Sequence, residues 1–193
     1  MSLKQILRYS FLFGALFAFA GTVMAQGPVS DNNTTTSNLE MTATVQTAVQ
    51  LNISTGAGGA TVSGSTATGL FSIAFGNVNG LGLGTPTAGV TVTVDASGAL
   101  YKTPINLTPV YSGFDTETAD ITVEAGTSGD EDLAREGNAS ISSSSTVSGT
   151  PVSVISNAAS GSNNERFVGF YIPRTELTGA KTATLIYTIT VQL

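Results

Sequence analysis

The sequence predicts an all-β protein, a sandwich of about eight or nine antiparallel strands. Gly, Ser and Thr are abundant while Lys and Glu are scarce, which disfavours helices and suits strands joined by tight turns. Short segments with alternating apolar and polar residues recur along the chain. We find no internal repeat, so a solenoid or propeller is not expected.

The first 25 residues have the layout of a secretory signal peptide. Lys4 and Arg8 precede an apolar run from Phe11 to Ala20, and small residues follow up to Ala25. The run is shorter than the roughly 20 residues that a membrane span needs. We therefore expect cleavage after Ala25 and export to the cell surface, the periplasm or the medium.

The exported chain is expected to have two parts. Residues 26–38 are polar without periodicity and predict a flexible leader. Residues 39–193 are predicted to form one sandwich domain, and no later apolar run is long enough for a transmembrane helix.

The longest alternating segment runs from Leu39 to Ile53, with a break at Thr47. A strand of this length would extend about 50 Å, more than one small domain covers. Either the segment bends near Thr47 and is the domain's own first strand, or its first half pairs with another molecule. In the second case the donated apolar side chains are Leu39, Met41, Ala43 and Val45.

Further strands and loops are predicted along the rest of the chain. Residues 54–69 are a glycine-rich loop or weak hairpin. Pro104 and Pro109 place residues 105–111 at a sheet edge, because proline cannot donate to a ladder. Residues 166–172 are apolar on both faces, which is typical of a central strand. The predicted strands after the first are 70–75, 90–94, 100–101, 105–111, 121–124, 152–154, 166–172 and 182–193.

The acidic residues are concentrated in one window. Without Lys4 and Arg8 the chain has five basic and thirteen acidic residues, and eight of the acidic ones lie between Asp115 and Glu136. Nucleic acid is therefore not an expected partner, because phosphate binding needs clusters of Lys and Arg. The centre of the window, residues 126–137, predicts a solvated loop with one helical turn.

A calcium site is an alternative interpretation of this loop. Its carboxylates Asp130, Glu131 and Asp132 are the oxygen ligands that calcium prefers, but their spacing does not match an EF-hand. A solvated acidic loop is the default interpretation.

Catalytic chemistry is not expected. The exported chain has no His, Cys or Trp, which excludes a Ser-His-Asp triad, a thiol nucleophile, a His-ligated zinc site and disulfides. Its clustered carboxylates lie in a Gly/Ser loop without the aromatic platform of a glycosidase cleft. The chain is predicted to be a non-enzyme that needs no cofactor.

The order of motifs resembles a known group of proteins. The alternating ATVQTAVQLNI at residues 43–53, FGNV at 75–78 and the YTITV strand at 187–191 are similar to bacterial secreted proteins of the DUF4402 type. They resemble, more loosely, spore-coat-U-like pilus subunits. The resemblance implies an immunoglobulin-like sandwich whose terminal strand is exchanged between subunits, with a copy of itself or a related subunit as partner.

Two functions are therefore expected as alternatives. The first is an extracellular structural subunit of a pilus, fibre or coat that assembles by strand addition. The second is a monomeric secreted module that binds a surface glycan through an aromatic platform of Tyr101, Tyr111, Phe114 and Tyr171.

Overall fold

The computed structural model describes residues 40–113 and 118–192. The chain divides into two units, residues 1–44 and 45–193, and the fold is that of the second unit. None of the described residues belongs to a helix long and apolar enough to cross a membrane. The described residues form strands and one short 3-10 helix, which confirms the all-β prediction.

The described strands are more numerous than the predicted eight or nine, because the glycine-rich segments contain short paired strands. In chain order they are β1 (Ala48–Thr55), β2 (Val62–Ser65), β3 (Leu70–Ile73), β4 (Gly76–Asn77), β5 (Thr85–Pro86), β6 (Thr91–Val94), β7 (Gly98–Ser112), β8 (Thr118–Ala125), β9 (Ala134–Gly137), β10 (Val152–Ala158), β11 (Asn164–Pro173) and β12 (Leu185–Gln192), with the 3-10 helix η2 (Glu131–Leu133) before β9. The helical turn predicted in the acidic loop corresponds to η2.

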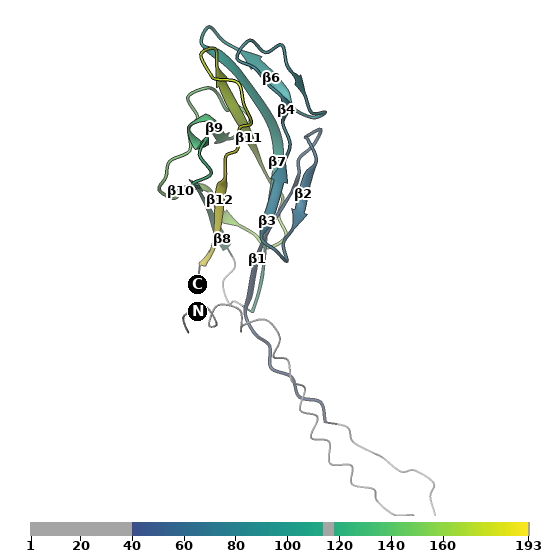
Figure 1. The fold of residues 1–193 in the computed structure, drawn as a ribbon. Helices are drawn as coiled ribbons and strands as arrows, with labels where there is room; N and C mark the ends of the chain where they lie inside the picture. The colour runs from purple at the N-terminus through teal and green to yellow at the C-terminus, as the bar shows by residue number, and fades with distance from the viewer. Residues whose placement is uncertain (1–39, 114–117, 193) are drawn as a thin grey trace, which may run out of the picture. The chain divides into compact units, whose positions relative to one another are not determined.

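The first sheet is built on β7, a strand of 15 residues. The sheet has the order β1-β7-β11-β9, and β6 pairs with the first part of β7 on the same side as β1 (Figure 1). All these pairs are antiparallel. Because β11 lies between β7 and β9, the prediction of a central strand at residues 166–172 is confirmed.

The prediction of an edge strand at residues 105–111 is wrong, because these residues belong to the central strand β7. The two prolines lie where β7 lacks a partner on one side. Pro104 falls between the residues paired with β6, which end at Lys102, and those paired with β1, which begin at Ile105. Pro109 lies beyond Leu107, the last residue that β11 pairs. A missing N–H therefore costs no ladder hydrogen bond on those sides.

The second sheet has the order β10-β8-β12 and packs face to face with the first. Ile105 and Leu107 of β7 and Ile121 of β8 belong to one buried cluster, against which Leu185 and Tyr187 of β12 also pack. Each strand contributes alternate residues to this core, as a sandwich requires. The structure is thus an antiparallel β-sandwich.

The strand order resembles that of an immunoglobulin domain, with β6 and β10 as additional strands. In such domains strands A, B, E and D form one sheet, and strands C, F and G form the other. Here β1, β7, β11 and β9 take the places of A, B, E and D, while β8 and β12 take those of C and F. Among the described residues no strand lies beside β12 in the place of G.

Only the second half of the alternating segment from Leu39 to Ile53 forms a strand of the domain. The strand β1 begins at Ala48, and residues 40–47 have no regular secondary structure and are exposed. The side chains of Met41 and Val45 are 81% and 84% exposed. Leu39 lies outside the described residues. The alternating apolar side chains that precede β1 are therefore exposed to solvent.

A buried ion pair joins two strands of the first sheet. The Arg166 guanidinium donates from Nε and Nη2 to the two carboxylate oxygens of Glu136, at 2.7 and 3.0 Å. The side chains are 16% and 4% exposed. This bidentate bond to Glu136 raises the pKa of Arg166.

We predict that Arg166→Met destabilises the fold by about 3–5 kcal/mol, because it leaves the Glu136 carboxylate buried without its partner. Replacing both residues, as in Arg166→Met with Glu136→Leu, is expected to recover most of the loss. The free energy of unfolding from urea denaturation checks this, with Glu165→Gln on the exposed face of β11 as a neutral control. Equal losses in the single and double variants would contradict it.

Candidate functional site

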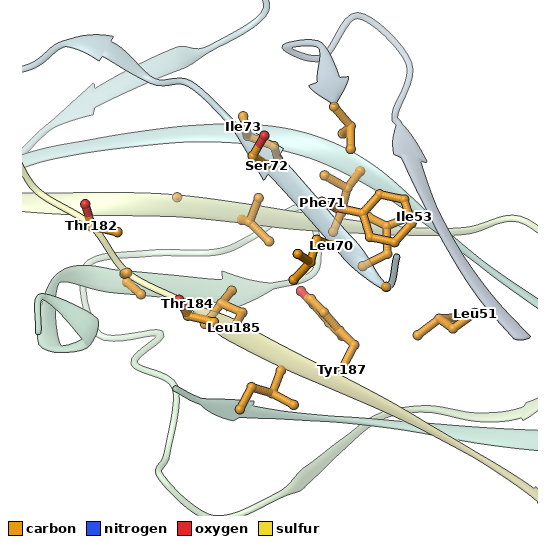
Figure 2. A pocket seen from close by; sticks show the side chains of 18 of the residues that line it. Leu51, Ile53, Leu70, Phe71, Ser72, Ile73, Thr182, Thr184, Leu185 and Tyr187 are labelled. Carbon is orange, nitrogen blue, oxygen red and sulfur yellow. The ribbon is translucent and has the colours of Figure 1, made fainter. Parts of the chain in front are cut away.

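An apolar groove of about 860 Å³ opens between the two sheets. Its walls are β1 of the first sheet and β12 of the second, and β3 lies across it (Figure 2). The main contributors are Val49, Leu51 and Ile53 from β1, Leu70, Phe71 and Ile73 from β3, and Lys181–Tyr187 from β12 and the residues before it.

Both walls of the groove are open sheet edges. The strands β1 and β12 each stand at the end of their sheet, and each pairs with one strand, β7 or β8. Along an edge strand every second residue directs its N–H and C=O groups away from the sheet. The groove thus combines an apolar floor with two rows of backbone hydrogen-bonding groups.

The alternation of the sequence explains the apolar floor. Along β12 every second residue, including Leu185 and Tyr187, is half-buried, and the residues between are exposed. Along β1, Leu51 and Ile53 pack against the buried cluster of Ile105 and Leu107. The side chains that face the groove are therefore those that would be fully covered if another strand lay between β1 and β12.

Tyr187 is the polar exception in the groove. Its ring is partly exposed, but its hydroxyl is buried and is the only buried side-chain polar atom of the described residues without a hydrogen-bond partner. Burial, followed by the nearby Glu136 carboxylate, raises the pKa of Tyr187 well above its ordinary value. A buried hydroxyl without a hydrogen-bond partner is costly, so this atom weakens the packing of the groove.

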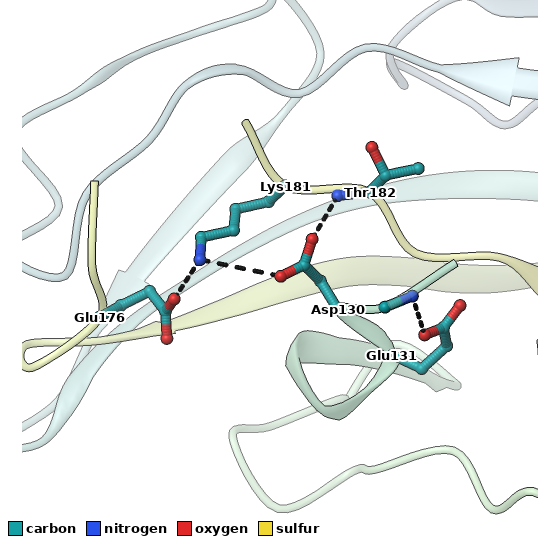
Figure 3. A network of polar contacts seen from close by, with 6 residues as sticks. Asp130, Glu131, Glu176, Lys181 and Thr182 are labelled. Atoms are coloured by element: carbon teal, nitrogen blue, oxygen red, sulfur yellow. Dashed lines mark hydrogen bonds and ion pairs between the residues drawn. The ribbon is translucent and has the colours of Figure 1, made fainter. Parts of the chain in front are cut away.

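The residues that lead into β12 are fixed by the acidic loop (Figure 3). Asp130 accepts a hydrogen bond from Thr182 N at 2.8 Å and donates from its own backbone N to Thr182 O at 3.2 Å. The Lys181 ammonium lies 3.7 Å from Asp130 Oδ1 and forms an ion pair with Glu176. These contacts hold one wall of the groove in place before its ladder with β8 begins.

Glu131 organises the loop itself. Its carboxylate accepts hydrogen bonds from the backbone N–H groups of Gly129 (2.7 Å), Ser128 and Thr184 (3.3 Å). These backbone donors, the Gly129 N–H first, lower the pKa of Glu131 to about 2. The carboxylate thus ties the loop to the residues before β12.

The calcium hypothesis finds no support in this geometry. No group of three or more acidic side chains suited to a metal ion occurs within the described ranges. Asp130 and Glu131 instead receive backbone N–H groups. The acidic loop has a structural explanation, so a bound cation remains only a prediction from composition.

The aromatic platform expected for glycan binding is not assembled. Tyr101 is fully buried, and its hydroxyl exchanges hydrogen bonds with the backbone of Asn79 at 2.9 and 3.0 Å. Tyr171 is 8% exposed and donates to Asp95 at 2.9 Å. Tyr111 is half-buried, and Phe114 lies outside the described residues. Two of the four predicted rings are thus core residues and cannot stack on a sugar.

The sequence pointed to the segment that could be donated but missed the groove. The residues of the groove come from strands at opposite ends of the chain. The alternation in these strands predicts that one face is buried, but it does not indicate which other element covers that face. The one available signal was the C-terminal strand, which alternates as regularly as the segment at Leu39–Val45.

The fold and the groove together define the class of the protein as an immunoglobulin-like sandwich that lacks a strand beside β12 in its described part. No family model matches the chain, and neither the curated proteins nor the solved structures include a significant match.

We predict that Tyr187→Phe stabilises the protein by about 1 kcal/mol near neutral pH, because it removes a buried hydroxyl without a partner. Since the pKa of Tyr187 is raised, the wild-type chain also loses stability above pH 10, and the advantage of the variant grows there. Urea denaturation between pH 7 and about 11 measures both effects. A less stable variant at neutral pH would show that the hydroxyl has a partner.

We predict that Glu131→Gln removes a pH-dependent part of the stability. Because the pKa of Glu131 falls from 4.5 to about 2 on folding, its contribution is complete above pH 4.5 and disappears as the pH falls to about 2. The difference in melting temperature between wild type and Glu131→Gln should therefore close over this interval. Glu165→Gln, an exposed carboxylate, serves as control. A difference that is independent of pH would contradict the assignment.

Proposed function

We propose that the protein is a non-enzymatic structural subunit that is exported and assembles with copies of itself by β-strand addition. The segment Leu39–Val45 of one subunit occupies the groove between β1 and β12 of the next. The observation that carries the proposal is the open place beside β12, in a chain that also exposes an alternating apolar segment.

The segment and the groove agree in length and chemistry. Seven extended residues span about 20 Å, and they match the eight residues of the β12 edge. With Leu39, Met41, Ala43 and Val45 on one face, the segment supplies apolar side chains to the floor of the groove. Its backbone pairs with the free edge at the same time, which is how β-strand addition achieves affinity.

The orientation follows from the strand order. In an immunoglobulin domain strand G runs antiparallel to F, and β12 takes the place of F. A donated segment that replaces G therefore runs antiparallel to β12 and parallel to β1. Antiparallel pairing is also the slightly more stable arrangement per residue.

The geometry of the chain favours donation to another copy. Only Gln46 and Thr47 separate Val45 from the start of β1. A return beside β1 would need a two-residue hairpin turn, and such turns require positive φ angles that Asn and Gly adopt readily. Among the described residues other than glycine, only Asn157 has a positive φ. A head-to-tail contact between copies is heterologous, so it builds rings or open filaments.

We predict that the chain from Gln26, the expected product of export, forms oligomers or fibres. Met41→Asp with Val45→Asp (the donor variant) and Val49→Arg (the acceptor variant) should each remain monomeric, because a charge then enters the apolar groove. A mixture of the two variants restores one donor and one acceptor, so it should stop at a dimer.

Light-scattering mass and negative-stain images measure these states. Leu83→Asp, which alters an exposed leucine in the loop between β4 and β5, is the matched control and should assemble like wild type. If the unaltered chain is a stable monomer, strand donation is rejected and the glycan-binding alternative gains weight.

A further inference from the structure

The hairpin of β2 and β3 belongs to neither sheet of the sandwich. It forms a two-stranded sheet of its own, with Val62 paired to Ile73 and Ser65 to Leu70. The chain enters and leaves this hairpin through firmly held residues. On one side Gly56 N donates to Pro104 O at 3.1 Å and Ala60 N donates to Thr103 Oγ1 at 2.7 Å.

The other side is held equally well. Phe75 packs edge to face on Phe170 with ring centroids 5.2 Å apart, and its carbonyl accepts a hydrogen bond from Thr87 N at 3.0 Å. Both ends of the hairpin at residues 61–74 are therefore fixed to the first sheet or to the loops attached to it.

The hairpin itself is held to the domain mainly by apolar side chains. Its one hydrogen bond to the rest of the described chain runs from Val62 N to Thr55 Oγ1 at 2.9 Å, near the base. Beyond that point the bonds are internal, within the ladder and between Ser65, Thr68 and Gly69. Phe71 and Ile73 face the groove and are half-buried, while Leu70 is 73% exposed.

The position of the hairpin overlaps the place of the absent strand. Phe71 and Ile73 line the same groove as Leu185 and Tyr187 of β12, and Figure 2 shows β3 between the side chains of the two walls. In this arrangement the hydroxyl of Tyr187 is buried without a partner. The closed hairpin therefore occupies space that a donated strand would also need, in a groove that keeps one unmet hydrogen bond.

We propose that the β2–β3 hairpin is a displaceable flap, which covers part of the groove in the free subunit and moves aside when a second copy donates its segment. This inference rests on the proposed function. The flap shields apolar side chains and the β12 edge from unspecific pairing before assembly. Because the donated segment competes with Phe71 and Ile73 for the same floor, the hairpin lowers the apparent affinity of the groove.

The test uses the donor variant, Met41→Asp with Val45→Asp, from Gln26 onward, and a synthetic peptide of residues 38–46. Since the chain has no cysteine, Phe71→Cys or Ile73→Cys introduces a single thiol on the inner face of the flap. Ser63→Cys, an exposed position on β2 that does not line the groove, is the matched control. Binding of the peptide is expected to raise the thiol-labelling rate at positions 71 and 73 about tenfold, and to leave the rate at position 63 unchanged.

A second variant measures the competition directly. Phe71→Ser weakens the flap, so the peptide should bind about tenfold more tightly, whereas Leu83→Ser should leave its affinity unchanged. Peptide binding with unchanged or slower labelling at positions 71 and 73, or weaker binding to Phe71→Ser, overturns the flap and leaves strand donation intact. Absence of peptide binding to every variant rejects strand donation and the flap together.

Discussion

Antiparallel pairing along β7 is the constraint on which the rest of the domain depends. This strand pairs with β11 over ten residues and with β6 and β1 on its other side. Its inward side chains, including Tyr101, Ile105 and Leu107, are fully buried. A slip of one residue would turn all of them to the opposite face, so the register is strongly specified. That register fixes where β1 begins and, with it, one wall of the groove.

The open edges of the two sheets are not equivalent. The edge strand β9 is only four residues long, and β10 has two register irregularities against β8. Short and bulged edges are poor templates for further pairing. By contrast, β12 forms a continuous ladder of eight residues with β8, without a shift. The edge best suited to accept a strand is therefore the edge that borders the apolar groove.

The sequence predicted the fold class and several strands because alternation is a local signal. It located the segments that became β1, β8, β11 and β12 and the helical turn η2. It failed at residues 105–111 because the rule for proline concerns only the side on which a strand is paired, and that side depends on distant partners. The predicted platform failed for a related reason, since burial of Tyr101 and Tyr171 depends on which faces the sheets bring together.

The acidic window has a role in the groove that its composition did not suggest. Residues 181–184 precede the ladder of β12, and the side chains of Asp130 and Glu131 fix them through backbone N–H groups. One wall of the groove therefore depends on carboxylates that lie about 50 residues earlier in the chain. The opposite wall, β1, is fixed mainly by its ladder with β7. The two walls are therefore held by different kinds of interaction: β1 by the register of the first sheet, and the residues before β12 by charge and hydrogen bonding.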